Sequence, residues 1–127
     1  MEIFENGYIV DVLDPHRDWG LYRNETNRDF IEGESYVKIP SECARRFNIV
    51  RGNQYTAFFE NGHPSMQIKA AGNGPVRNGV QYAKQFEGIG RGACKAFTPW
   101  YDSCDIQSGD YIEVRFLSSS EILFTKL

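Results

Sequence analysis

Residues 39–60, IPSECARRFNIVRGNQYTAFFE, and residues 98–117, TPWYDSCDIQSGDYIEVRFL, follow the same pattern. Each stretch has a proline near its start, Pro40 or Pro99, and then a short segment of helical character. Each continues with Ile-x-x-Gly-[Asn/Asp] and a β-rich run that opens on an aromatic residue. A helix, a turn and a strand form one supersecondary unit, and two copies in a small domain predict a pseudo-symmetric β-barrel with two short helices. Two unrelated joints of similar composition are the alternative.

Most of the remaining chain has the length and pattern of short strands. Seven apolar or alternating runs cover residues 7–13, 35–39, 55–59, 66–70, 80–86, 111–117 and 121–126. Tyr55 and Tyr111 open the two runs of the repeat, and Asn61-Gly62 is a hairpin signal. Six side chains are expected to face the core: Val37, Ile39, Phe58, Ile112, Val114 and Phe116. We therefore expect one mainly β domain over residues 1–127, with about seven strands and two short helices.

Length and composition fit a single soluble domain. The 127 residues are 41% hydrophobic and 14% aromatic, which is enough for one core. The three cysteines, Cys43, Cys94 and Cys104, are odd in number and lack the spacing of a metal site, so we expect free thiols in a reducing compartment. The N-terminal residues contain no long apolar run, which argues against a signal peptide or a membrane span. A cytoplasmic protein without a cofactor or bound metal is expected.

The charge of the chain is unevenly distributed. The net charge is −3, but residues 66–97 carry five basic residues against one acidic residue, and residues 37–59 carry four against one. The charged residues among residues 1–14 are all acidic. A basic middle between acidic ends indicates a positive face, which permits a polyanionic partner without requiring one.

Signals for catalysis are weak. His16 and His63 lie next to turn prolines and outside any known metal-binding motif. The glycine run at residues 88–92 lacks the full pattern of a phosphate-binding loop. Asp110 and Glu113 resemble the carboxylates of a metal-dependent nuclease, but a Gly-Asp turn explains the first of them structurally. We therefore expect a binding domain rather than an enzyme, with a metal-dependent nuclease as a less favoured alternative.

Two irregular segments carry the types of side chain that read nucleic acid. Residues 17–28 are rich in arginine, asparagine and aromatic residues, and residues 73–84 offer Asn73, Arg77, Asn78, Gln81, Tyr82 and Lys84. Arginine contacts guanine through two hydrogen bonds, asparagine and glutamine contact adenine in the same way, and lysine and backbone amides hold phosphate. Two such loops could enter a duplex groove from either side, although ordinary solvated loops have a similar composition.

Several of these residues occur in the order found in a known family. DWG at residues 18–20 and Arg28 precede ESYVKIP at residues 34–40, and FFENG at residues 58–62 and a Gly/Asn-rich segment follow. Over residues 17–127 the chain resembles the B3-like DNA-binding domains of bacterial type II restriction endonucleases. Within that family it is most similar to the C-terminal domain of the phospholipase-D-type restriction enzymes.

The resemblance implies a seven-stranded open pseudo-barrel with two short helices, which holds double-stranded DNA between two loop arms in the major groove. Residues 17–34 would form the N-arm and residues 71–84 the C-arm. The chain departs from the family in a longer stretch over residues 23–33 and in Pro75-Val76-Arg77, which replaces the usual lysine of the C-arm. The catalytic nuclease domain of such a restriction system would lie elsewhere in the parent protein or on a partner subunit.

The resemblance and the loop composition together assign candidate roles. Side chains expected to contact bases are Arg23, Asn24, Arg28, Asn73, Arg77 and Asn78. Side chains expected to contact phosphates are Arg17, Lys38, Arg45, Arg51, Lys69, Lys84 and Arg91. Trp19 and Tyr36 are expected to brace the N-arm. The alternative function is a small β-barrel module for protein association, in which the basic middle plays no part in binding.

Overall fold

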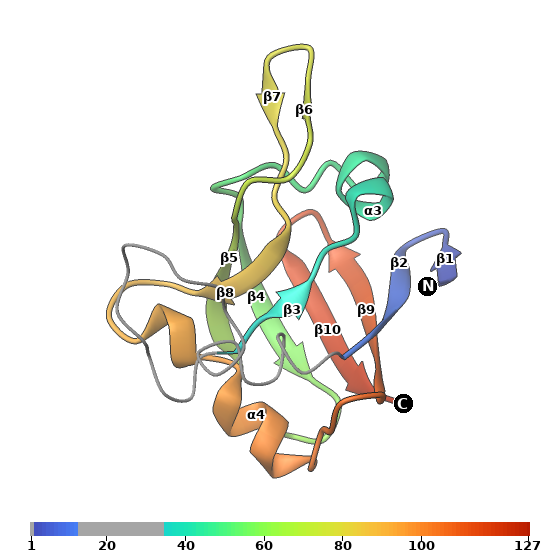
Figure 1. The fold of residues 1–127 in the computed structure, drawn as a ribbon. Coiled ribbons are helices and arrows are strands. Elements are labelled where there is room, and N and C mark those ends of the chain that lie inside the picture. The colour runs from blue at the N-terminus through green and yellow to red at the C-terminus, as the bar shows by residue number, and fades with distance from the viewer. Residues whose placement is uncertain (1, 13–34) are drawn as a thin grey trace.

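One open β-sheet dominates the fold (Figure 1). A computed structural model describes residues 2–12 and 35–127. Within them the elements are β1 (Glu2–Phe4), β2 (Gly7–Asp11), β3 (Val37–Lys38), α3 (Ser41–Arg46), β4 (Gln54–Phe59), β5 (Met66–Ala71), β6 (Val76–Arg77), β7 (Val80–Gln81), β8 (Gln85–Gly88), the 3-10 helix η1 (Ala93–Lys95), α4 (Thr98–Ser103), β9 (Tyr111–Ser118) and β10 (Glu121–Lys126). Eight strands form the sheet in the order β1-β2-β9-β10-β4-β5-β8-β3, and β6 and β7 pair apart from it.

The expected fold class is confirmed only at the coarser level. Over the described residues the protein is mainly β, with an open sheet and two short α-helices, but it has ten strands and the expected number of seven is wrong. Two of the differences have a local origin. β1 pairs with β2 in an N-terminal hairpin. The single run expected at residues 80–86 divides into β7 and β8, because Ala83 N between them donates to Ile49 O.

The two sequence copies have the same backbone conformation. Ile49 N donates to a carbonyl of the preceding helix at 2.8 Å, and Ile106 N does the same in the second copy at 3.0 Å. The residue before each isoleucine has φ 52°, and the turn glycines that follow, Gly52 and Gly109, both have φ 96°. The repeat is therefore structural and not a coincidence of composition.

The copies align differently in the structure and in the sequence patterns. The carbonyls of Pro40 and Phe97 each accept the first backbone hydrogen bond of the helix that follows. Phe97, and not Pro99, is therefore the structural counterpart of Pro40. The β-rich run is shifted by one residue, so that Tyr55 corresponds to Ile112, and both side chains are buried. The sequence alignment fails at its ends because the aromatic residue that opens each run is not at the same structural position.

Strand β10 joins the two copies within the sheet. It pairs with β9 in the antiparallel direction and with β4 in the parallel direction. The outer partners are also equivalent, because β5 pairs with β4 as β2 pairs with β9. Ala70 N and Val12 N each donate, at 2.8 Å, to the turn of their own copy. Ala70 and Val12 therefore occupy equivalent positions in the two copies.

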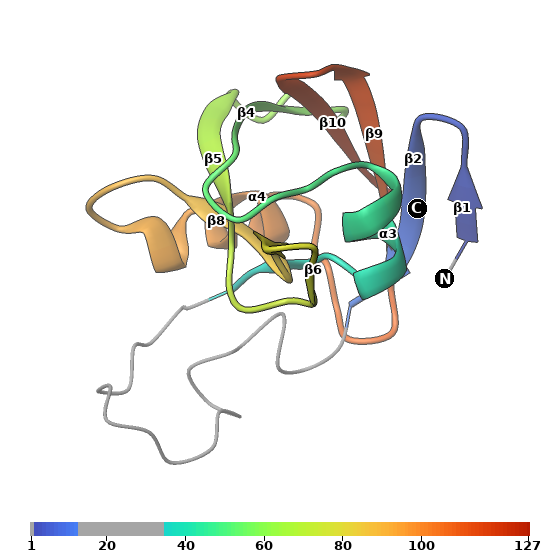
Figure 2. The same cartoon turned by 90° about the horizontal axis from the view of Figure 1, so that it is seen from above.

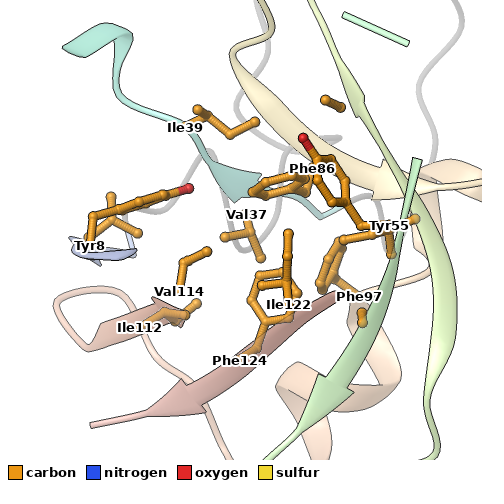
Figure 3. Packing of buried hydrophobic residues seen from close by; sticks show 14 of the residues in the cluster. Tyr8, Val37, Ile39, Tyr55, Phe86, Phe97, Ile112, Val114, Ile122 and Phe124 are labelled. Carbon is orange, nitrogen blue, oxygen red and sulfur yellow. The ribbon is translucent and has the colours of Figure 1, made fainter. Parts of the chain in front are cut away.

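Aromatic and branched side chains fill the inside of the curved sheet (Figure 3). Buried residues of β2, β3, β4, β5, β8, β9 and β10 meet there, and Trp100 and Tyr101 of α4 pack into the same core. Four expected core residues are confirmed as buried, namely Val37, Ile39, Ile112 and Val114. Phe116 is half-buried against the core. The prediction for Phe58 is wrong, because the inward face of β4 carries Tyr55, Ala57 and Phe59.

The β6–β7 hairpin projects beyond one end of the sheet, and α3 lies near its foot at the same end (Figure 1). Helix α4 lies at the opposite end. Seen from above, β3 and β8 lie on the side of the molecule that faces away from β9 and β10 (Figure 2). Among the described residues, neither helix has the length and apolar character needed to cross a bilayer.

Candidate nucleic-acid interface

The C-arm expected from the sequence contains a two-stranded β-hairpin. Arg77 of β6 pairs with Val80 of β7, and Asn78 and Gly79 form the two-residue turn between them. Their φ angles are 52° and 78°, and a type I′ turn requires positive values at both positions. Arg77 and Asn78 are exposed at the tip. The hairpin projects beyond the body of the domain (Figure 1), and its exposed tip carries two polar side chains of base-reading type.

Hydrogen bonds fix the foot of the hairpin to the segment between α3 and β4. Tyr82 forms a β-bridge with Val50, and Arg51 N donates to Gln81 O at 3.0 Å. Gln81 Nε2 donates to Gly74 O at 2.9 Å. A Cβ at Gly74 would lie 2.6 Å from a backbone oxygen of the returning chain, so no larger residue fits there without movement. The arm is therefore anchored at its foot and free at its tip.

Two lysines line a hollow beside this foot. Lys38 of β3 and Lys84 before β8 enclose a volume of about 280 Å³ together with Tyr36, Ile39, Pro40, Ser41 and Gln85. Ile39 N donates to Lys84 O at 2.9 Å, which holds the two lysine-bearing segments side by side. A pair of ammonium groups with a hydroxyl and an amide nearby suits an anionic oxygen such as that of a phosphate.

Arg51 and Lys69 line a second, smaller hollow of about 170 Å³ near the hairpin. Arg51 Nη1 donates to Asn73 Oδ1 at 3.0 Å, so the asparagine expected to contact a base is joined to an arginine expected to contact a phosphate. Lys69 lies directly opposite Glu87 in the register of β5 and β8. Because that carboxylate reduces the local positive charge, Lys69 is a weaker phosphate candidate than Arg51.

Neither Arg45 nor Arg91 lines these two hollows. Arg45 is half-buried in the last turn of α3, and Arg91 is exposed in the segment between β8 and η1. Tyr36 is only 2% exposed, and its carbonyl accepts a hydrogen bond from the Tyr101 hydroxyl at 2.6 Å. Five N-arm residues lie outside the described residues: Arg17, Trp19, Arg23, Asn24 and Arg28.

The carboxylates considered for a nuclease have structural contacts. Asp110 Oδ2 accepts a hydrogen bond from Gln107 N at 2.9 Å and lies 3.7 Å from Lys126 Nζ. Glu113 forms an ion pair with Arg115 at 3.0 Å. Over residues 2–12 and 35–127, no three His, Cys, Asp or Glu side chains are grouped as metal ligands would be. Asp110 and Glu113 thus each have a partner within the chain.

Sequence reasoning missed two groups of residues. Ser41 and Gln85 line the lysine hollow, and an aromatic cluster that includes Phe47 and Phe116 lines another hollow near α3. Both hollows are assembled from segments far apart in the chain. A single sequence shows which residues are polar or aromatic, but not which strands pair, so no signal in it could have placed these residues together.

Comparison with known proteins gives no family assignment. No protein-family model matches the chain, and no curated protein matches it. The geometry and chemistry of the site, and the resemblance of the sequence motifs to B3-like domains, are therefore the basis for a functional proposal.

Proposed function

We propose that the chain binds double-stranded DNA through its hairpin arm and the basic surface at the foot of that arm. The observation that carries the proposal is the hairpin itself, which exposes Arg77 and Asn78 at the tip of an anchored two-stranded ribbon. Such a ribbon fits the major groove, where arginine pairs with guanine and asparagine with adenine. Lys38, Lys84 and Arg51 line hollows at the foot, which supports a role for them as contacts to the phosphates beside the groove.

The internal repeat supports a second arm. Residues 71–84 follow Ala70, and residues 13–34 follow its counterpart Val12. The second segment contains the remaining base-contact candidates, Arg23, Asn24 and Arg28. Two arms that start from equivalent positions of a pseudo-symmetric sheet are suited to hold a duplex between them. The resemblance to B3-like domains also implies two arms that hold a duplex. The open sheet and the two short helices are compatible with the fold that the resemblance implies.

By this proposal the chain is the targeting module of a bacterial restriction system and acts in the cytoplasm. The cleaving nuclease domain is then part of the parent protein or of a partner subunit. Affinity comes from lysine and arginine on phosphates, and sequence specificity comes from the side chains at the arm tips. Neither role needs a cofactor.

The decisive experiment measures duplex binding against salt concentration. Bound duplexes are selected from a random pool, and the affinity for the selected site is measured by fluorescence anisotropy at several salt concentrations. Lys38→Gln and Lys84→Gln should each weaken binding and lower the slope of log K against log salt by about one unit per lost phosphate contact. Lys126→Gln is the matched control, because Lys126 lies at the other end of the sheet beside Asp110.

Three results would contradict the proposal. Duplex affinity that does not depend on salt would exclude phosphate contacts as its source. Equal changes in the three lysine variants would show that the hollow beside the hairpin has no special role. A chain that does not bind any duplex and instead binds another protein would be the protein-association module.

A further inference from the structure

A third hollow, the aromatic hollow, lies next to the end of α3, whereas the lysine hollow lies next to its start. Its volume is about 450 Å³, within the ~300–1,000 Å³ range of small-molecule sites. The turn between β1 and β2, the segment from the end of α3 to the start of β4, and the turn between β9 and β10 form its walls. The lining residues are Glu5, Asn6, Phe47, Asn48, Asn53, Tyr55, Phe116, Ser118 and Ser119.

Aromatic rings form the floor of the aromatic hollow. Phe47 and Phe116 are stacked, with ring centroids 5.2 Å apart and planes inclined by 28°. Tyr55 meets Phe116 edge-on at 6.2 Å. Phe47 and Phe116 are only half-buried, so part of each ring is open to the hollow. Phe47 also stacks with Tyr8, with ring centroids 6.2 Å apart. A flat aromatic ligand would gain apolar burial and aromatic contact with the parts of these rings that stay open.

The equivalent space beside α4 is filled by side chains. The counterpart of Phe116 is Phe59, which is 6% exposed. Trp100 packs on Phe59 at 4.8 Å, and His63 meets its ring edge-on at 5.1 Å. The counterpart of Trp100 in the first copy is the small residue Cys43, so Phe116 has no such cover. Trp100 and Phe59 thus fill, beside α4, the space that is open beside α3. The fold therefore does not by itself require the aromatic hollow.

Amide groups surround the aromatic floor. Asn53 Nδ2 donates to Asn48 O and to the Tyr55 hydroxyl, both at 3.2 Å. Among the described residues, Asn53 Oδ1 and the side-chain amides of Asn48 and Asn6 have no hydrogen-bond partner. Burial raises the pKa of Tyr55, so its hydroxyl keeps its proton.

The equivalent polar groups of the second copy are already satisfied. Asp105, the counterpart of Asn48, accepts a hydrogen bond from Gln107 Nε2 at 2.8 Å. Asp110, the counterpart of Asn53, accepts one from Gln107 N and lies beside Lys126. The space beside α3 thus differs from the equivalent space beside α4 in having both an open ring surface and unused amide groups.

We propose that the aromatic hollow binds a nucleobase. The combination of a flat apolar floor and a rim of amides matches a planar heterocycle whose edge donates and accepts hydrogen bonds. The exposed carboxylate of Glu5 on the rim disfavours an anion inside the hollow. Outside it, the Arg46 guanidinium lies 5.9 Å from the centre of the Phe47 ring, where it is placed to contact a phosphate attached to the bound base.

The base could come from a free nucleoside or from a nucleotide extruded from a duplex, and only the second source rests on the proposed DNA binding. The first experimental arm titrates the full chain with the four common deoxynucleosides and 5-methyldeoxycytidine by calorimetry. Ser119→Trp should fill the hollow and abolish binding. Asn48→Asp should weaken it about tenfold, as expected for the loss of an amide contact to a base edge.

Two variants control for the fold. Asp105 has the same φ of 52° as Asn48, so aspartate is accommodated in that backbone conformation and Asn48→Asp should fold normally. Ser108→Trp places the same large side chain on an exposed turn of the other copy. It should leave nucleoside binding unchanged, and melting temperatures should confirm that all three variants are folded.

The second arm uses duplexes that carry 2-aminopurine, whose fluorescence rises when the base leaves the stack. A rise with the unaltered chain and with Ser108→Trp, but not with Ser119→Trp, would support extrusion of a base into the hollow. Nucleoside binding without duplex binding would support the hollow and contradict the proposed DNA function. Duplex binding without a fluorescence change, together with no nucleoside binding, would overturn this inference and leave the DNA proposal intact.

Discussion

Asn48 and Asp105 occupy the same left-handed backbone conformation, with φ 52° at both positions, at the end of the helix in each copy of the repeat. Each residue follows the last turn of its helix and precedes a buried isoleucine, Ile49 or Ile106. Asparagine and aspartate tolerate this conformation better than other residues with a side chain. The direction in which each chain leaves its helix is therefore determined by a single residue of suitable type.

Substitution of these two residues by valine tests that role. Asn48→Val and Asp105→Val should each lower the free energy of unfolding by ~1–2 kcal/mol, because a β-branched residue is strained at positive φ. Asn48→Gly should retain the stability of the unaltered chain. Urea denaturation of the three variants measures the effect. Equal stability of the valine and glycine variants would mean that the left-handed conformation is not required.

The inward face of β4 and β9 gives a second prediction. Ile112→Ala should cost ~2–5 kcal/mol of folding free energy, because Ile112 is 1% exposed and its removal leaves a cavity. Phe58→Ala should cost clearly less, since Phe58 lies on the opposite face from Tyr55 and Phe59. Thermal or urea unfolding of the two variants decides between them. A larger loss of folding free energy for Phe58→Ala than for Ile112→Ala would show that Phe58 lies on the inward face of β4.

The parts of the fold that could be predicted from the sequence are those determined locally. The helix, the Gly-Asn or Gly-Asp turn and the following strand are encoded within a few residues, and Asn78-Gly79 encodes the hairpin turn in the same way. The inward face of β4 could not be predicted, because Phe58 and Phe59 are both large and apolar. Period-two alternation is uninformative where both faces of a strand carry apolar residues.

The candidate site was predictable only as a segment. The Gly/Pro-rich composition of residues 71–84 indicates a projecting loop, and the structure places a hairpin there. Which basic side chains lie at its foot depends on the pairing of β3 with β8 and of β5 with β8. These pairings join segments far apart in the chain, so charge composition alone could not separate Lys38 and Lys84 from Arg91.

Burial of Cys43 gives a prediction at alkaline pH. Burial, and next the nearby Glu42 carboxylate, raise the pKa of the Cys43 thiol from 9.0 to about 11. The folded chain thus keeps this proton up to about pH 11, whereas the unfolded chain loses it near the ordinary value. Folding is then favoured fully below about pH 9, and stability falls as the pH rises toward 11.

The comparison of the unaltered chain with Cys43→Ala isolates this contribution, because the buried tyrosines are present in both. Between about pH 8 and pH 11, the unaltered chain should lose about 2 kcal/mol more than the variant, because the full effect of two pKa units at 1.36 kcal/mol each is reached only above pH 11. Urea unfolding at both pH values measures the difference. Identical pH profiles would show that the thiol of Cys43 is accessible to water in the folded state.

The tip of the hairpin gives the prediction that separates base contacts from phosphate contacts. Arg77→Ala should cost ~1–3 kcal/mol of binding free energy on the selected duplex and much less on scrambled DNA, because a bidentate contact to a base depends on sequence. Asn78 must be changed to glycine rather than alanine, since its φ is 52° and the type I′ turn must be preserved. Lys84→Gln should weaken both duplexes equally. Equal losses for Arg77→Ala on both duplexes would make Arg77 a phosphate contact, and no loss on either would exclude the hairpin from the interface.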